Sequence, residues 1–121
     1  MSTRAAISLT TGLEDPEKLT VALLVAVGAA EAGRETLMFV TKEAVRITLS
    51  GYAVATACEG CPTVEDLLKR YEAAGGRFLV CPLCFNARRL DADALPDHAT
   101  LGGTVQLWEW IGEEPVTTFS Y

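Results

Sequence analysis

The stretch "PTVEDLLKRYEAAGGRFLVC", residues 62–81, predicts a helix followed by a buried strand. Thr63 with Asp66 three residues later is typical of a helix start, with Asp in place of the usual Glu or Gln of a capping box. Apolar side chains recur at helical spacing in the turns that follow, and the pair Gly75-Gly76 ends the helix. The run "RFLV" is then a short strand that ends directly before Cys81. A capped amphipathic helix leading into such a strand is typical of an α/β fold.

The rest of the chain repeats this alternation of strands and helices. "RAAISLT" (residues 4–10) and "ETLMFV" (residues 35–40) are interpreted as strands, separated by a helix from residue 16 to about residue 32 that Asp15 caps. Residues 42–53 are interpreted as a short helix in spite of their β-branched side chains. After Cys81 the sequence predicts a short helix over residues 83–89, an extended piece at 98–103, a helix over 104–113 capped by Thr104, and a last strand at 115–121.

Size, charge and hydropathy limit the classes of function. At 121 residues and 13.0 kDa the chain is expected to form one domain over residues 1–121. A net charge of −6 and a pI near 4.7 argue against nucleic acid or an anionic membrane as partner, because both need a cationic surface. Half of the residues are hydrophobic and the mean hydropathy is +0.24, so we expect a homo-oligomer that covers part of this surface.

Location is predicted from the lack of targeting segments in the sequence. The longest apolar-rich run, residues 19–30, falls well short of the ~20 residues that span a bilayer. The first ten residues do not have the pattern of a signal peptide. We therefore expect a cytoplasmic protein without a membrane partner, whose thiols stay reduced.

Four cysteines form two C-x-x-C pairs, Cys58 with Cys61 and Cys81 with Cys84. In a parallel sheet the helix between the pairs would run away from the carboxyl edge and the strand would return to it, so both pairs should lie at that edge. Cys81 would also lie at the amino end of the next helix, where unpaired N–H groups stabilise a thiolate. Cys84, one turn further on, is placed to resolve a disulfide or to share a transferred sulfur.

Of three other interpretations of the cysteines, the zinc site and the inert thiols stay open, and the thioredoxin-like one does not. The spacing C-x2-C-x19-C-x2-C fits a zinc site made of Cys58, Cys61, Cys81 and Cys84, although the helix and strand between the pairs are unlike a zinc ribbon. A thioredoxin-like oxidoreductase would carry its motif near the start of the chain, whereas this one lies two-thirds through. All four side chains could instead be inert, serving as small apolar groups.

Three further sets of residues are candidates for a function. The pair Arg88 and Arg89 could hold an anion or a nearby carboxylate, but it is interpreted as solvated helix surface. His98, in the polar stretch "PDHAT", is interpreted as an exposed loop residue rather than a general base. Trp108 and Trp110 face different directions at helical spacing, so at least one should be exposed or lie in an interface.

The chain resembles the DsrE/DsrF-like family over nearly its whole length. The resemblance rests on the opening "ISLTTGLEDPEKLTVALLVAVGAAEAG", on "LMFVTKEAVRI", on "TVEDLLKRYEAAGGRFLVCP", on "LGGTVQLWEWI" and on the closing "VTTFSY". Its most specific element is Cys81 after the third strand, where the sulfur-relay members carry their sulfur-accepting cysteine. The chain departs from the plain relay pattern by carrying Cys84 and the additional pair Cys58 and Cys61.

The resemblance implies a fold, an assembly and a function. The fold is a three-layer Rossmann-like or flavodoxin-like α/β sheet of about five mostly parallel strands with helices on both faces, and the assembly is a homotrimer or homohexamer. The function is that of a sulfur carrier, with a persulfide on Cys81 and with sulfur-donor and sulfur-acceptor proteins as partners. No cofactor is expected for this function, whereas the alternative, a structural module without catalysis, would use the four cysteines as zinc ligands.

Overall fold

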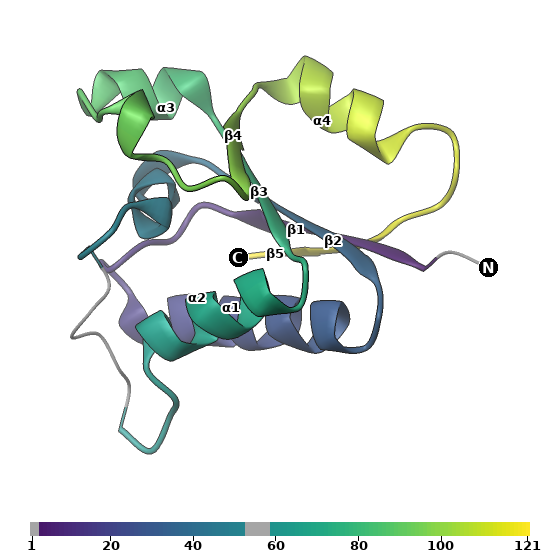
Figure 1. Ribbon diagram of the computed structural model, residues 1–121, viewed down its shortest axis with the longest axis horizontal. Coiled ribbons are helices and arrows are strands. Elements are labelled where there is room, and N and C mark those ends of the chain that lie inside the picture. Colours follow the sequence, from purple (N-terminus) through teal and green to yellow (C-terminus); the bar gives the residue numbers. More distant parts are fainter. Residues whose placement is uncertain (1–2, 53–58) are drawn as a thin grey trace.

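The computed structural model of the protein describes residues 3–52 and 59–121. Five parallel strands form one sheet in the order β4-β3-β2-β1-β5. The strands are β1 (Arg4–Leu9), β2 (Glu35–Val40), β3 (Arg77–Val80), β4 (Ala99–Leu101) and β5 (Thr117–Ser120). The chain moves from β1 outward to β4 and then returns to place β5 on the other side of β1 (Figure 1). The predicted α/β class is therefore confirmed, and every strand pair in the sheet is parallel.

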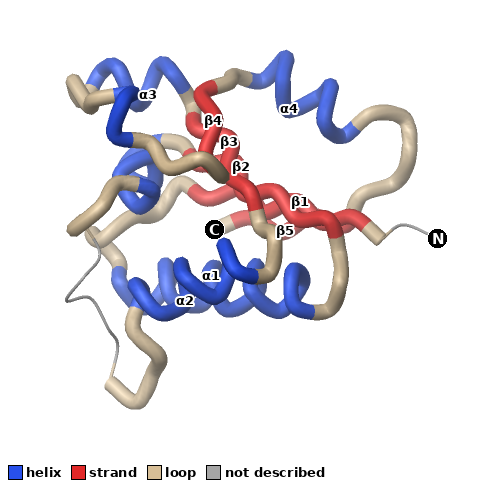
Figure 2. Tube along the Cα trace, viewed as in Figure 1, coloured by secondary structure: helices blue, strands red, loops and turns tan. Residues whose placement is uncertain are grey.

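Helices cover both faces of this sheet and make three layers (Figure 2). The helices are α1 (Pro16–Glu31), α2 (Val64–Ala73), α3 (Pro82–Ala87) and α4 (Thr104–Ile111), with 3₁₀ helices η1 (Lys42–Thr48) and η2 (Ala92–Ala94). Figure 1 shows α1 and α2 below the sheet and α3 and α4 above it. No helix in the described ranges is both long and apolar enough to cross a membrane.

The ends of α1 and α2 follow from local capping chemistry. The Asp15 carboxylate accepts a hydrogen bond from the backbone N–H of Lys18, and Pro16 occupies the first turn of α1. The hydroxyl of Thr63 accepts from the N–H of Asp66 at 3.1 Å, as the capping pattern predicts. These bonds satisfy donors that the first turn of a helix leaves unpaired, which is why both helix starts were predictable.

The core lies mainly between the sheet and the pair α1 and α2. Its largest fully buried side chains include Tyr71, Phe78 and Phe85. A smaller cluster on the opposite face consists of Leu37, Phe39 and Leu79, with Leu107 and Trp110 of α4 packed on it. No residue of α4 is fully buried. The α4 side of the sheet is therefore less covered than the α1–α2 side.

Two predicted elements differ in detail from the structure. Residues 42–48 form a 3₁₀ helix in place of the expected short α-helix, and residue 53, the last of that prediction, lies outside the described part. The β-branched side chains of Val45 and Ile47 are buried in the core, and such side chains disfavour α-helix. Gly103, and not Thr104, is the cap of α4, because the Gly103 N–H donates to Oε1 of Gln106 at 2.9 Å.

Candidate thiol site at the carboxyl edge of the sheet

The carboxyl ends of neighbouring strands meet at one edge, and hydrogen bonds between strand ends hold them in register. The N–H of Cys81 donates to the carbonyl of Val40 at 3.0 Å, and the N–H of Thr41 donates to the carbonyl of Leu9 at 3.0 Å. Cys81 is therefore fixed beside the end of β2 immediately after β3 ends. This is the edge at which open α/β sheets bind their ligands.

Cys81 is a free thiol at the junction of β3 and α3. Its extended backbone (φ −62°, ψ 117°) makes it the residue that caps α3, and its carbonyl accepts from the N–H of Phe85 at 3.0 Å. Pro82 occupies the first helical position, where its lack of an N–H removes no needed donor. The side chain is half-buried and contacts both apolar clusters, so the sulfur lies at the boundary between core and solvent.

Cys84 is the second free thiol of this site. It lies on α3 one turn after Cys81, is also half-buried, and packs against the main core cluster. Neither cysteine is enclosed in the core as an inert apolar side chain would be. Leu83 between them is 83% exposed, so the turn that carries both thiols projects into solvent. The structure thus brings the predicted pair Cys81 and Cys84 together on one accessible turn.

An ion pair between η1, which follows β2, and the C-terminal end of α3 holds α3 in place. Nε of Arg88 lies 2.8 Å from Oε1 of Glu43, and Nη1 of Arg88 donates to the Cys84 carbonyl at 3.1 Å. Arg46 holds the other oxygen of Glu43, with Nε to Oε2 at 3.1 Å. The hydrogen bond from Arg88 is the main cause that lowers the pKa of the Glu43 carboxyl below its ordinary value, and Arg46 adds to it. Glu43 therefore stays ionised at neutral pH and ties the segment after β2 to the turn that carries Cys84.

The two arginines of this helix have different roles. The interpretation of Arg88 as solvated surface is wrong, because its side chain is only 23% exposed and bonded to Glu43 and Cys84. Arg89 is exposed, as expected, and adopts a left-handed backbone (φ 56°) directly after the helix. The sequence does not reveal the Arg88 contact, since Glu43 lies 45 residues away.

Of the second cysteine pair, only Cys61 falls within the described residues. Cys58 falls outside the described residues. Cys61 precedes α2 and is disulfide-bonded, so its sulfur is not one of the free thiols. Among the described residues no group of three or more His, Cys, Asp or Glu side chains is arranged to hold a metal ion. Within these residues the thiol site consists of Cys81 and Cys84.

His98 and the two tryptophans complete the set of candidates. The His98 side chain is only 17% exposed and packs edge-on against Phe78, so its interpretation as an exposed loop residue is wrong. Trp108 is 68% exposed, which confirms that at least one tryptophan faces outward. Trp110 is partly covered by Arg4, whose guanidinium carbon lies 4.0 Å from the ring centroid. His98 lies just before β4, whereas Trp110 packs on the same small cluster, Leu37, Phe39 and Leu79, that Cys81 contacts.

Comparisons with known proteins agree with this architecture. The profile of the DsrE/DsrF-like family matches residues 4–117. The crystal structure of the YchN protein from E. coli is similar, with a TM-score of 0.71 and 22% identity over 96% of this chain and 99% of that chain. MTH1491 from Methanobacterium thermoautotrophicum, described as a protein of unknown function, has a TM-score of 0.67 and 12% identity, covering 98% of both chains. A search of curated proteins gave no match.

Proposed function

The chain belongs to the DsrE/DsrF-like family, and on that basis we propose that it carries sulfane sulfur as a persulfide on Cys81. The observation that carries this proposal is the free, half-buried Cys81 at the end of β3, with a second free thiol one turn further along α3. A carrier needs a sulfur atom that a donor can reach and that its own fold partly shields from solvent. Cys81 meets both needs.

The transfer requires no oxidant, reductant or metal. The Cys81 thiolate attacks the outer sulfur of a donor persulfide, the donor S–S bond breaks, and the donor leaves as a thiolate. The product is a persulfide on Cys81, and the number of S–S bonds is unchanged. Cys84 can then attack the outer sulfur of that persulfide and take it over, which returns Cys81 to the thiol. Arg88 and Glu43 act as positioning residues for the turn on which this exchange takes place.

Intact-mass spectrometry after incubation with a low-molecular-weight persulfide tests the proposal. We expect the wild type to gain the mass of one sulfur, reversibly with dithiothreitol. Cys81→Ser should lose the adduct, and Cys84→Ser should keep it. Cys84→Ser is the matched control, because it removes a thiol from the same turn. Absence of an adduct on the wild type, or an undiminished adduct on Cys81→Ser, would contradict the assignment.

We further propose that the chain works as a cytoplasmic homotrimer or homohexamer that receives sulfur from one protein and passes it to another. Support comes from the thinly covered α4 side, where Val105 and Trp108 of α4 are 64% and 68% exposed. Large exposed apolar side chains gathered on one side are typical of an interface. The free thiols of Cys81 and Cys84 suit the cytoplasm, where thiols stay reduced, whereas the disulfide at Cys61 departs from that expectation.

A further inference from the structure

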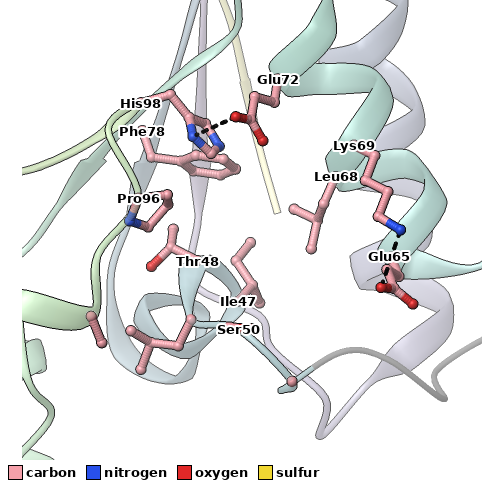
Figure 3. Close-up of a pocket in the computed structure, with 13 residues that line it drawn as sticks. Ile47, Thr48, Ser50, Glu65, Leu68, Lys69, Glu72, Phe78, Pro96 and His98 are labelled. Atoms are coloured by element: carbon pink, nitrogen blue, oxygen red, sulfur yellow. Dashed lines mark ion pairs between the residues drawn. The ribbon is translucent and has the colours of Figure 1, made fainter.

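A cavity of about 270 Å³ lies on the α2 side of the sheet and contains none of the residues assigned to the thiol site (Figure 3). α2 forms one wall, the residues at the end of η1 form another, and the segment that leads into the edge strand β4 forms a third. Phe78 of β3 lines the cavity and contacts Tyr71 of α2, whereas the next residue, Leu79, belongs to the cluster on the α4 side. The cavity and the α4 side of the sheet are therefore separate surfaces.

The inner surface of this cavity is apolar and firmly held. Ile47 and Phe78 line it and are each only 2% exposed, so their positions are set by the core. Leu68 projects from α2 toward Ile47, as Figure 3 shows. Such a surface binds the apolar part of a ligand through the hydrophobic effect, and the volume is close to the lower end of the range of small-molecule sites.

The charges at the rim do not cancel. Glu65, Lys69 and Glu72 are spaced four and three residues apart and share one face of α2. Nζ of Lys69 lies 3.4 Å from Oε1 of Glu65, and this pair is close to neutral. Glu72 faces His98 instead (Figure 3). Burial lowers the pKa of His98 below its ordinary value of 6.5, so the ring is neutral at pH 7 and leaves one negative charge, on Glu72.

The polar end of the cavity is short of hydrogen-bond donors. Nδ1 of His98 is buried and has no hydrogen-bond partner among the described residues. It lies 3.8 Å from Oε1 of Glu72, which is beyond hydrogen-bond length. With the ring proton on Nε2, both atoms are acceptors, and a cationic N–H donor between them would satisfy both. The Glu72 side chain is 60% exposed, so it can turn to admit such a donor.

We propose that this cavity binds a small organic monocation, a primary amine with an aryl or alkyl body. The ammonium group lies at Glu72 and His98, and the apolar body lies over Phe78 and Ile47. The Glu65–Lys69 pair disfavours neither charge, so the selectivity for a cation comes from Glu72. This site does not depend on the sulfur chemistry proposed for Cys81.

Titration of the full chain with 2-phenylethylamine at pH 7.5, followed by NMR chemical shifts, tests the proposal. We expect saturable binding of one amine per chain, about fivefold tighter than 2-phenylethanol, with 3-phenylpropionate weakest. Glu72→Gln should remove the preference for the amine, while Glu109→Gln, an equal change of charge on α4, should not. Absence of saturable binding, or equal binding of the alcohol or the acid to the wild type, would overturn the proposal.

A second pair of variants locates the binding without touching the charges. Ala94 lines the cavity on η2, and Ala92 lies on the same short helix but does not line it; both are exposed. Ala94→Trp should weaken amine binding at least tenfold because the indole occupies the cavity mouth. Ala92→Trp should bind as the wild type does. Equal affinity for the amine in the two variants would place the binding elsewhere and refute the site.

Discussion

The Tyr71 ring lies close to the backbone of Gly76 in the turn between α2 and β3. A Cβ at Gly76 would overlap Cε1 of the Tyr71 ring. The ring is fully buried, and its hydroxyl lies 2.7 Å from the Arg77 carbonyl and 3.2 Å from that of Thr36, so it has little freedom to move. A glycine is required here by close approach rather than by its backbone angles.

We therefore predict that Gly76→Ala lowers the free energy of unfolding by about 1–3 kcal/mol, the usual cost of overpacking. Urea denaturation measures this change. Gly28→Ala is the matched control, because a Cβ there meets nothing within 4 Å and the site lies inside α1. That control should gain about 0.5–1 kcal/mol from helix propensity. A Gly76→Ala variant as stable as the wild type would refute this packing argument.

His98 makes the stability of the protein depend on pH. Burial is the largest cause that lowers its pKa and Arg77 adds to it, while the negative charges of Glu72 and Asp97 oppose it. The unfolded chain therefore takes up a proton at a higher pH than the folded chain does. The contribution of the neutral His98 to the free energy of unfolding is complete above pH 6.5. It is lost as the pH falls from 6.5 toward the lowered pKa of the folded state.

Urea denaturation at pH 7.5 and at pH 5.5 checks this prediction. The wild type should be less stable at pH 5.5, and His98→Gln should show a smaller loss between the two pH values. Both measurements stay above the range in which the Glu43 carboxyl, whose pKa is lowered, titrates. An identical loss in the wild type and in His98→Gln would mean that another group is responsible.

At the scale of elements, the short helix α3 depends on the Glu43–Arg88 ion pair. The helix has only six residues, too few to be stable by itself, and its C-terminal end is held by Arg88 through Glu43 and the Cys84 carbonyl. Arg88→Met should cost about 0.5–1 kcal/mol, because both side chains are partly exposed. Amide hydrogen exchange in α3 should become faster.

The Arg70–Glu31 pair provides the control for this prediction. Nη2 of Arg70 lies 2.8 Å from Oε1 of Glu31, and this pair joins α2 to α1 on the other side of the sheet. Arg70→Met removes an ion pair of the same kind and should leave hydrogen exchange in α3 unchanged. If Arg88→Met and Arg70→Met leave α3 equally protected, Arg88 is not a positioning residue.

The elements were largely predictable from the sequence, and their long-range contacts were not. Asp15 and Thr63 mark helix starts because caps act within three residues, and "RFLV" is a strand because buried parallel strands are continuously apolar. The Glu43–Arg88 pair needs the sheet register to bring together segments 45 residues apart. Cys81 could be singled out by its place after a strand, whereas the cavity at His98 arises only from how η1, α2 and the approach to β4 assemble.

At the scale of the whole molecule, the thinly covered α4 side is the expected interface. We predict that Trp108→Asp shifts the assembly from a trimer or hexamer toward the 13.0 kDa monomer, because a buried carboxylate opposes association. Light scattering coupled to size-exclusion chromatography measures the mass. Val21→Asp, on α1 at the opposite face, is the control and should leave the assembly intact. A wild-type mass of 13.0 kDa would contradict the proposed oligomer.

The most direct test of the central claim is to locate the transferred sulfur by mass spectrometry. Trypsin releases residues 78–88, FLVCPLCFNAR, with both free thiols in one peptide. After treatment with a persulfide donor and alkylation, fragment ions that separate the two cysteines should place the additional sulfur on Cys81 at the earliest times. A Cys84→Ser protein should show the same location. Sulfur found first on Cys84, or on neither residue, would contradict the account.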